Sequence, residues 1–385
     1  MQDFVLHNPT KIIFGKERIK TLAKEIPKEA GVMLVYGGGS IKANGVYDQV
    51  KQALAGYRLI EFGGVEANPD FDTLMRGVEL ARAEGIDFLL AVGGGSVADG
   101  VKFMAAAMPC QGDPMEILTT HGRSIKQAVP FGCVLTLPGT GSEMNNGSVI
   151  SRRSIKAKLV FSSPLVFPRF SVLDPVTTYS LPPRQTSNGV VDTFVHITEQ
   201  YLTYPVDGKV QDRFAEGLLL TLLEEGPKAL AEPENYDVRA NLMWCATLGL
   251  NGLIGAGVPQ DWATHMIGHE LTALYGLDHA QTLAVILPGM LTVCAEKKQQ
   301  KLLQYAERVW GITSGSDAER IEATIAKTSA FFETMQVSTR LSSYGLGADC
   351  IPAVLEQLTA HGLTALGEQS DVTPEVARKA LETRL

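Results

Sequence analysis

The first half of the chain repeats one local pattern, in which a buried apolar run ends in glycines and leads into a helix. The pattern occurs in GVMLVYGGGS at residues 31–40 and in IDFLLAVGGGS at residues 86–96. Short apolar runs bounded by glycine are typical of strands that are buried on both faces. Strands that alternate with helices predict a parallel sheet covered by helices on both sides, so we expect an α/β fold here.

The glycine turns also suggest a phosphate site. A glycine-rich turn between a strand and a helix lets backbone N–H groups approach a phosphate, and the helix N-terminus then faces its negative charge. Residues 93–96 stand at such a junction, and Asp99 follows one turn into the helix. Neither turn has the GxGxxG spacing of the usual dinucleotide motif, so a purely structural tight turn is the alternative interpretation.

A third small-residue segment is CVLTLPGTGSEMNNGSVI, at residues 133–150. A predicted strand ends at Pro138, and the loop after it offers hydroxyl groups and free N–H groups. Such a loop can hold a sugar, a phosphate or a nicotinamide amide, and it can equally be an ordinary surface loop.

The character of the sequence changes near residue 180. LPPRQTSNG, at residues 181–189, holds two prolines and is typical of a domain boundary. Long helical patterns follow it and strand signals fade. We therefore predict an α/β dinucleotide-binding domain at residues 1–180 and an all-helical metal-binding domain at residues 181–385. Ser187 is the predicted N-cap of the first helix after the boundary.

Histidines are concentrated in two helical segments of the second half. VVDTFVHITEQ contains Asp192 and His196, and WATHMIGHELTALYGLDHA contains His265, His269 and His279, so four of the seven histidines fall here. Spacing of four residues puts the members of a pair on one helix face. Imidazoles and one carboxylate that converge from two helices suit a divalent transition metal with a position left for a substrate oxygen. Spacing alone does not say which downstream histidine is not a ligand, and core histidines are the alternative.

Composition excludes several classes of protein. The net charge is −8 and no lysine- or arginine-rich run occurs, which argues against a nucleic-acid partner. No apolar stretch approaches the roughly 18 residues that a membrane span needs, and the first residues do not have the pattern of a secretory signal. Five scattered cysteines without a CxxC pair predict a reducing, cytoplasmic location.

Taken together, these segments resemble the iron-containing, metal-dependent alcohol dehydrogenases over essentially the whole chain. The resemblance is carried by GGGSVADGVKF at residues 93–103, by TLPGTGSEMN at residues 136–145 and by the two histidine segments, in that order. It is strongest toward bacterial NADPH-dependent aldehyde reductases and butanol dehydrogenases. It implies a dehydroquinate synthase-like fold, with an α/β nucleotide-binding domain followed by an all-α metal-binding domain.

The resemblance also implies roles for individual residues. The metal ligands fall on Asp192, His196, His265 and His279, and His269 is then left as an unligated catalytic group near the nicotinamide or substrate. The residues assigned to the cofactor are Gly37, Gly38, Gly39, Ser40, Asn68, Gly94, Gly95, Ser96, Asp99, Thr136, Leu137, Thr140, Ser142 and Lys158.

The first glycine turn bears on the choice between NAD and NADP. A strand end that holds a free ribose 2′-hydroxyl usually presents an acid, which repels a 2′-phosphate. Residues 37–40 are GGGS, where Ser40 can donate a hydrogen bond and Lys42 can add positive charge. The sequence therefore favours NADP(H), with NAD(H) as the alternative. Three imidazoles and one carboxylate bind Fe²⁺ and Zn²⁺ alike, so the predicted metal is one of these.

The predicted reaction is reversible hydride transfer between NADPH and an aliphatic aldehyde. An NAD(H)-preferring alcohol or polyol dehydrogenase is the first alternative. A dehydroquinate synthase-like lyase is disfavoured because the helical half has no dense basic set for a phosphorylated substrate, and a non-catalytic binding protein is disfavoured because all four ligands are present. The expected partners are a small aldehyde or alcohol and a second copy of the chain, paired through its alternating N-terminal segment.

Overall fold

The computed structural model describes residues 1–385, which divide into two compact units. The sheet unit comprises His7–Leu181 and Glu234–Thr247, and the helical unit comprises Met1–Leu6, Pro182–Pro233 and Leu248–Leu385. The sequence prediction had one boundary, between residues 180 and 181. Two short segments cross that boundary: the first six residues group with the helical unit, and residues 234–247 group with the sheet unit.

The sheet unit is built on six parallel strands, as the alternating sequence pattern predicts. Every residue of the strand that precedes the first glycine turn is buried, which explains its unbroken apolar run. In their order across the sheet, the strands are β1 (Lys11–Phe14), β8 (Phe170–Leu173), β5 (Phe131–Leu137), β4 (Phe88–Gly94), β2 (Gly31–Tyr36) and β3 (Arg58–Phe62).

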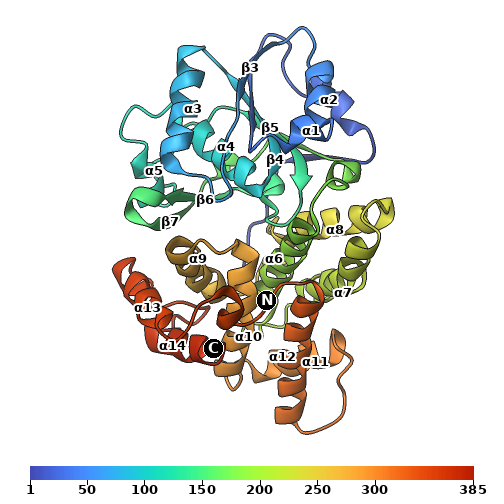
Figure 1. Ribbon diagram of the computed structural model, residues 1–385, viewed down its shortest axis with the longest axis vertical. Helices are drawn as coiled ribbons and strands as arrows, with labels where there is room; N and C mark the ends of the chain where they lie inside the picture. The colour runs from blue at the N-terminus through green and yellow to red at the C-terminus, as the bar shows by residue number, and fades with distance from the viewer. The chain divides into compact units, whose positions relative to one another are not determined.

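Helices cover both faces of this sheet (Figure 1). Met33 and Leu89 pack in one apolar cluster, whereas their strand neighbours Leu34 and Leu90 pack in the cluster on the opposite face. The first cluster takes in α3 (Phe71–Ala83), α4 (Gly95–Ala107) and α5 (Met115–Thr119), and the second takes in α1 (Ser40–Ala43) and α2 (Val46–Ala53). An antiparallel pair, β6 (Gly147–Arg152) and β7 (Ala157–Ser162), and helix α8 (Tyr236–Gly249) complete the unit.

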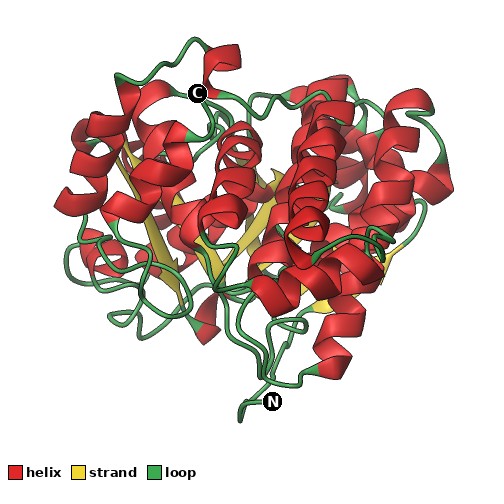
Figure 2. Ribbon diagram, turned by 90° about the horizontal axis from the view of Figure 1, so that it is seen from below, coloured by secondary structure: helices red, strands yellow, loops and turns green.

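The helical unit contains no strand, in agreement with the predicted all-α second domain. Figure 2 shows the helices of the chain in red and its strands in yellow. Its core is formed by apolar faces of α9, α10, α13 and α14, and Ile267, Ile286, Val354 and Leu381 are fully buried in it. The helices are α6 (Pro183–Tyr201), α7 (Lys209–Ala231), α9 (Ala263–Tyr275), α10 (His279–Val293), α11 (Gln299–Arg308), α12 (Asp317–Thr334), α13 (Cys350–Ala360) and α14 (Pro374–Glu382). None of them is long and apolar enough to cross a membrane.

The start of α6 differs from the prediction. Ser187 was predicted to be the N-cap, but it is a buried residue inside the helix, which begins at Pro183 with Pro182 as the cap. Proline is well suited to the first helical position, because its φ is already helical and the N–H it lacks would have no partner there. The two prolines therefore start the helix one turn earlier than a capping hydroxyl would.

Candidate active site

Helix α6 brings Asp192 and His196 together on one face, one turn apart. Both side chains are buried, at 6% and 5% exposure, and His196 Nε2 lies 3.6 Å from Asp192 Oδ1. The aromatic and β-branched residues around them keep this face of α6 in the protein interior. A buried carboxylate is stable only when it is paired or bound to a cation, so the Asp192 carboxylate is expected to bind a positive charge.

The remaining histidines come from α9 and α10. Helix α9 carries His265 and His269 and ends at Gly276, whose φ of 70° is the left-handed conformation common after helices. Asp278 then caps α10 in a capping box with Gln281, so His279 is the first residue of that helix. The sequence signal of three nearby histidines thus resolves into two helices joined by a tight turn.

Asp278 also fixes the position of α10 against α6. Its carboxylate accepts hydrogen bonds from Arg184 Nε and Asn188 Nδ2, each at 2.7 Å, and both donors lie on α6. The residue before His279 is therefore tied directly to the helix that carries Asp192. Sequence reasoning did not identify this role, although a capping aspartate before a histidine was visible in the sequence.

Three imidazole nitrogens surround one oxygen of Asp192. The Nε2 atoms of His196 and His279 each lie 3.6 Å from Asp192 Oδ1, and that of His265 lies at 3.9 Å. This oxygen is buried and accepts no hydrogen bond within the protein. Ligand atoms of Asp192, His265 and His279 all lie within 4.8 Å of one another. Donors about 2.1 Å from a tetrahedral metal are about 3.4 Å apart, so these residues fit a divalent ion.

His196 and His269 occupy different positions at this cluster. The His196 ring stacks on that of His265, with centroids 4.6 Å apart, and its Nε2 approaches Asp192. The His269 ring is buried beside His279, at 5.2 Å between centroids, and lies 6.3 Å from His265. His269 is thus next to the cluster but is not among the ligand atoms gathered around Asp192 Oδ1.

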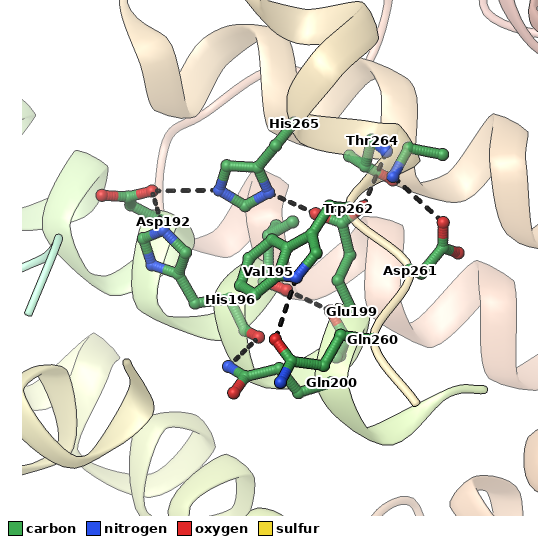
Figure 3. A network of polar contacts seen from close by, with 12 residues as sticks. Asp192, Val195, His196, Glu199, Gln200, Gln260, Asp261, Trp262, Thr264 and His265 are labelled. Carbon is green, nitrogen blue, oxygen red and sulfur yellow. Dashed lines mark hydrogen bonds and ion pairs between the residues drawn. The ribbon is translucent and has the colours of Figure 1, made fainter. Parts of the chain in front are cut away.

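A carboxylate that the sequence reading missed holds His265 from behind (Figure 3). Glu199 Oε2 contacts His265 Nδ1, and Glu199 Oε1 accepts a hydrogen bond of 2.6 Å from the backbone N–H of Thr264. Burial raises the pKa of Glu199 well above its usual value. Glu199 follows His196 by three residues on α6, and this spacing was the available sequence signal. With Nδ1 engaged, His265 presents Nε2 to Asp192.

In the sheet unit, the first glycine turn leaves open space above its backbone. A side chain at Gly38 or Gly39 would contact nothing within 4 Å, and Gly39 has a φ of 97°, which favours glycine. Ser40 follows as the first residue of α1. The turn therefore offers exposed backbone groups at the end of β2, where parallel sheets bind nucleotides.

The second glycine turn meets the loop that follows β5. A Cβ atom on Gly95 would lie 2.2 Å from Thr140 Oγ1, and one on Gly94 would lie 3.0 Å from Leu137 Cβ. Ser96 Oγ accepts a hydrogen bond of 3.3 Å from the backbone N–H of Asn68. Residues predicted from three separate segments to bind the cofactor are therefore adjacent in the fold, as is Thr136 at the end of β5.

Asp99 and Ser142 bond to each other. Ser142 Oγ donates to Asp99 Oδ1 at 2.5 Å, and the N–H of Val149 donates to Asp99 Oδ2 at 2.9 Å. Burial raises the pKa of Asp99, and the charges of Lys102 and Lys158 oppose that rise. Both oxygens of Asp99 are thus engaged by protein groups, which links α4 to the loop and to β6. Lys158, on β7, lies close enough for its charge to act on Asp99.

Lys102 is another residue that sequence reasoning missed. Its side chain is fully buried, and its ammonium donates to Ser142 Oγ at 2.8 Å, to Asn145 Oδ1 at 2.7 Å and to the Gly147 carbonyl at 2.7 Å. Burial lowers its pKa to about 8, against the attraction of Asp99. The sequence signal for this role was a lysine within the strongly apolar α4, because a lysine is buried in such a helix only when polar groups bind its ammonium.

An acid does lie near the first glycine turn, contrary to what its GGGS sequence suggests. Glu61 is on β3, opposite Leu34 of β2. Tyr47 Oη donates to its carboxylate at 2.5 Å, and the ammonium groups of Lys42 and Lys51 lie at 3.4 Å and 3.5 Å. The hydrogen bond from Tyr47 lowers the pKa of Glu61. The acid is therefore neutralised by two lysines that remain partly exposed.

The sequence of the chain matches one family along both units. The sequence model of the iron-containing alcohol dehydrogenases matches residues 9–175, and that of the C-terminal part of the Fe-containing alcohol dehydrogenase family matches residues 186–374. The chain therefore belongs to the iron-containing alcohol dehydrogenase family, as the resemblance of its motifs implied.

Particular relatives extend along nearly the full length. The chain is 62% identical to the NADPH-dependent aldehyde reductase YqhD of Escherichia coli over 384 residues, which cover 99% of each chain. It is 41% identical to a probable NADH-dependent butanol dehydrogenase of Bacillus subtilis, over 94% of this chain and 95% of that one. A solved structure of the substrate- and cofactor-free form of Escherichia coli YqhD superimposes with a TM-score of 0.94, at 59% identity, and covers 100% of both chains.

Proposed function

We propose that this chain is a metal-dependent, NADP(H)-linked alcohol dehydrogenase that works as an aldehyde reductase. The observation that carries the proposal is the position of Asp192 Oδ1, which is buried and faces three imidazole nitrogens at 3.6–3.9 Å. Full-length identity of 62% to a protein named as an NADPH-dependent aldehyde reductase supports the same function.

The proposed ligands are Asp192, His196, His265 and His279. Three neutral imidazoles and one carboxylate leave a Fe²⁺ or Zn²⁺ ion with net positive charge and room for one more oxygen donor. An ion held there would supply a Lewis acid for an aldehyde oxygen, and bound NADPH would supply the hydride. The protein's part is to hold the imidazoles in orientation in buried surroundings, which Glu199 does for His265 through its Nδ1.

His269 is the proposed proton-handling group. It is buried, it lies beside His279, and its ring is not one of the three whose Nε2 atoms approach Asp192 Oδ1. An imidazole titrates near neutral pH, so it can give a proton to an alkoxide in one direction and accept it in the other. No other histidine in the cluster is left for this role.

The cofactor is proposed to lie along the two glycine turns and the loop after β5. Gly94, Gly95 and Ser96 stand at the N-terminus of α4, where backbone N–H groups favour a pyrophosphate. At the first turn, Ser40 and the two lysines paired with Glu61 favour a 2′-phosphate over a bare ribose. NAD(H) is the alternative, because Glu61 is nearby and the Bacillus subtilis relative is named as NADH-dependent. Lys158 is proposed to reach the cofactor from β7.

A homodimer in the cytoplasm is the proposed state. The N-terminal segment exposes apolar side chains, with Phe4 at 49%, Val5 at 96% and Leu6 at 46% exposure, and Phe214 on α7 adds another at 47%. Contiguous exposed apolar residues of this kind commonly mark an interface. Strand β1 is an edge strand of its sheet, which leaves it able to pair with another chain. All five cysteines are free, which suits a reducing compartment.

Steady-state kinetics test the proposal directly. NADPH oxidation is followed at saturating butanal, with NADH assayed in parallel, and the reverse reaction is followed with butanol and NADP⁺. We expect turnover in both directions and a higher kcat/KM for NADPH than for NADH. Turnover with NADH alone would support the alternative, and no turnover with either would contradict both.

A further inference from the structure

We propose that Lys298, a buried residue that touches no metal ligand, positions the metal centre through Asp261 and Glu199. The proposal rests on the metal site described above and goes beyond it. It assigns control of metal affinity to a series of charged residues, Lys298, Asp261 and Glu199, of which Glu199 contacts one of the ligands from outside the site. Lys298 lies just before α11, its side chain is 7% exposed, and it is not part of any ligand segment.

The series begins at Glu199, which holds His265 in place. Its two carboxylate oxygens contact His265 Nδ1 and the Thr264 backbone N–H, while its own carbonyl oxygen accepts a hydrogen bond of 2.9 Å from the N–H of Asp261. Glu199, on α6, therefore bonds both to the first turn of α9 and to the loop before it (Figure 3). A carboxylate on the second ring nitrogen fixes the tautomer and orientation of a ligating histidine.

Asp261 is the next member. Its Oδ1 accepts a hydrogen bond of 3.0 Å from the backbone N–H of Ala263, the first residue of α9. Its Oδ2 lies 2.9 Å from Lys298 Nζ. One oxygen of Asp261 is thus bonded to the first N–H of the helix that carries His265, and the other is held by the lysine. The side chain of Asp261 is 8% exposed, so water contributes little to its solvation.

Lys298 joins two of the three helices that supply the ligands. Its ammonium donates to the carbonyl of Leu202, the C-cap residue of α6, at 2.6 Å, and contacts the carboxylate of Glu368 at 2.8 Å and 3.0 Å. With Asp261 at the start of α9, one cation therefore bridges the end of α6 and the beginning of α9. The spacing between Asp192 and His196 on α6 and His265 on α9 depends on this bridge.

Electrostatics make the bridge sensitive to the loss of the cation. Asp261 and Glu368 are both nearly buried and both contact the same ammonium, so without it two carboxylates would face each other across a small distance. Removing one partner of a buried ion pair leaves an uncompensated charge. The nearest relief is movement of Asp261 away from Glu368, and this movement carries the start of α9 and His265 with it.

The test compares Lys298→Met with Lys297→Met in the full-length protein. Lys297 is the preceding lysine, is mostly exposed and pairs with Asp371 on the surface, so it controls for the loss of one charge in the same segment. The apoproteins are titrated with Zn²⁺ against a competing chelator, and Co²⁺ is used to report coordination geometry by its visible absorption. For Lys298→Met we expect about tenfold weaker Zn²⁺ binding and a shifted Co²⁺ spectrum, within the range usual for outer-shell changes. Lys297→Met should match the unchanged protein.

Three further variants keep the test decisive. Lys298→Arg retains the charge and should keep Zn²⁺ affinity within about threefold of the unchanged protein. If Lys298→Met does not fold, Glu199→Gln and Asp261→Asn keep side-chain volume and should each weaken Zn²⁺ binding by about 10–100-fold. The proposal is overturned if folded variants at Lys298, or at both Glu199 and Asp261, bind Zn²⁺ and Co²⁺ like the unchanged protein. Failure of the proposed function would show separately, as metal-loaded unchanged protein that does not oxidise NADPH.

Discussion

The buried ammonium of Lys102 lies 2.8 Å from the hydroxyl of Ser142, and this contact joins α4 to the loop that follows β5. The same hydroxyl donates to Asp99, one turn earlier on α4. The second glycine turn is at the start of α4, and the loop carries Thr140, so the contact fixes two of the proposed cofactor segments relative to each other. The polar groups of Lys102, Ser142 and Asp99 bond to one another, so they affect a bound cofactor indirectly, by holding these two segments in place.

Replacing Lys102 with methionine is expected to destabilise the protein strongly. The substitution removes three hydrogen bonds from the buried ammonium to the loop and one of the two lysine charges that act on Asp99. Leaving a buried polar group without its hydrogen-bond partner costs about 1–3 kcal/mol. Denaturant unfolding measures the loss. Lys126→Met, at an exposed position, should change the free energy of unfolding by less than about 0.5 kcal/mol. A similar small change at Lys102 would show that this contact contributes little.

The stability of the protein should depend on pH through the same residue. The pKa of Lys102 is about 8 in the folded protein and 10.5 ordinarily, so above pH 8 the unfolded chain holds more protons than the folded one. The free energy of unfolding therefore rises with pH in this window. Burial raises the pKa of Cys133 from 9.0 to about 12, which acts in the opposite direction above pH 9. Between pH 8 and pH 9, the slope should be more positive for the unchanged protein than for Lys102→Met, and equal slopes would contradict this assignment.

His279 and His269 should behave differently when each is replaced by alanine. His279→Ala removes a nitrogen 3.6 Å from Asp192 Oδ1 and should weaken Zn²⁺ binding by more than the roughly 10–100-fold typical of outer-shell changes. His269→Ala should bind Zn²⁺ within a few-fold of the unchanged protein but lose turnover, with an altered pH profile of kcat. Metal affinity is measured by chelator competition and the pH profile by kcat at a series of pH values, for both variants. Loss of metal in His269→Ala would exchange the two assignments.

Sequence reasoning identified the fold class because its signals are local. The apolar run of β2 is unbroken because both faces of that strand are covered, and the spacing of Asp192 and His196 needs only a helix to bring them together. The signal that separates the histidines near Asp192 Oδ1 from His269 is not local in the sequence. It depends on where α9 ends, at Gly276, and on the capping of α10 by Asp278, which together bring His279 close to Asp192.

The residues missed from the sequence share one property: their partners are distant in the chain. Glu61 faces Lys42 because β3 pairs with β2, and Lys102 reaches Gly147 because α4 packs beside β6. Glu199 was close to His196 in sequence, but its contact with His265 required α9 to be placed against α6. Spacing within one helix is readable from sequence, whereas a partner supplied by another element is not.

The choice of cofactor is tested at Ser40. Ser40→Asp adds an acid at the first glycine turn and should lower kcat/KM for NADPH by at least about tenfold, equivalent to ~1.4 kcal/mol, because the carboxylate repels a 2′-phosphate. The value for NADH should change far less. Ser40→Asn is the matched control, because asparagine has nearly the same size as aspartate but no charge. This variant should retain the preference for NADPH. An equal loss with both cofactors in Ser40→Asp would mean that the 2′-phosphate does not bind at this turn.

The most direct test of the central claim is restoration of activity by metal. The protein is stripped with a chelator, divided, and reloaded anaerobically with Fe²⁺ or with Zn²⁺, and NADPH oxidation by butanal is measured for each sample beside His265→Ala treated identically. We predict that the stripped protein is inactive, that at least one metal restores turnover, and that neither metal restores it in His265→Ala. Full activity in the stripped protein, or restored activity in His265→Ala, would contradict a catalytic metal held by Asp192 and these histidines.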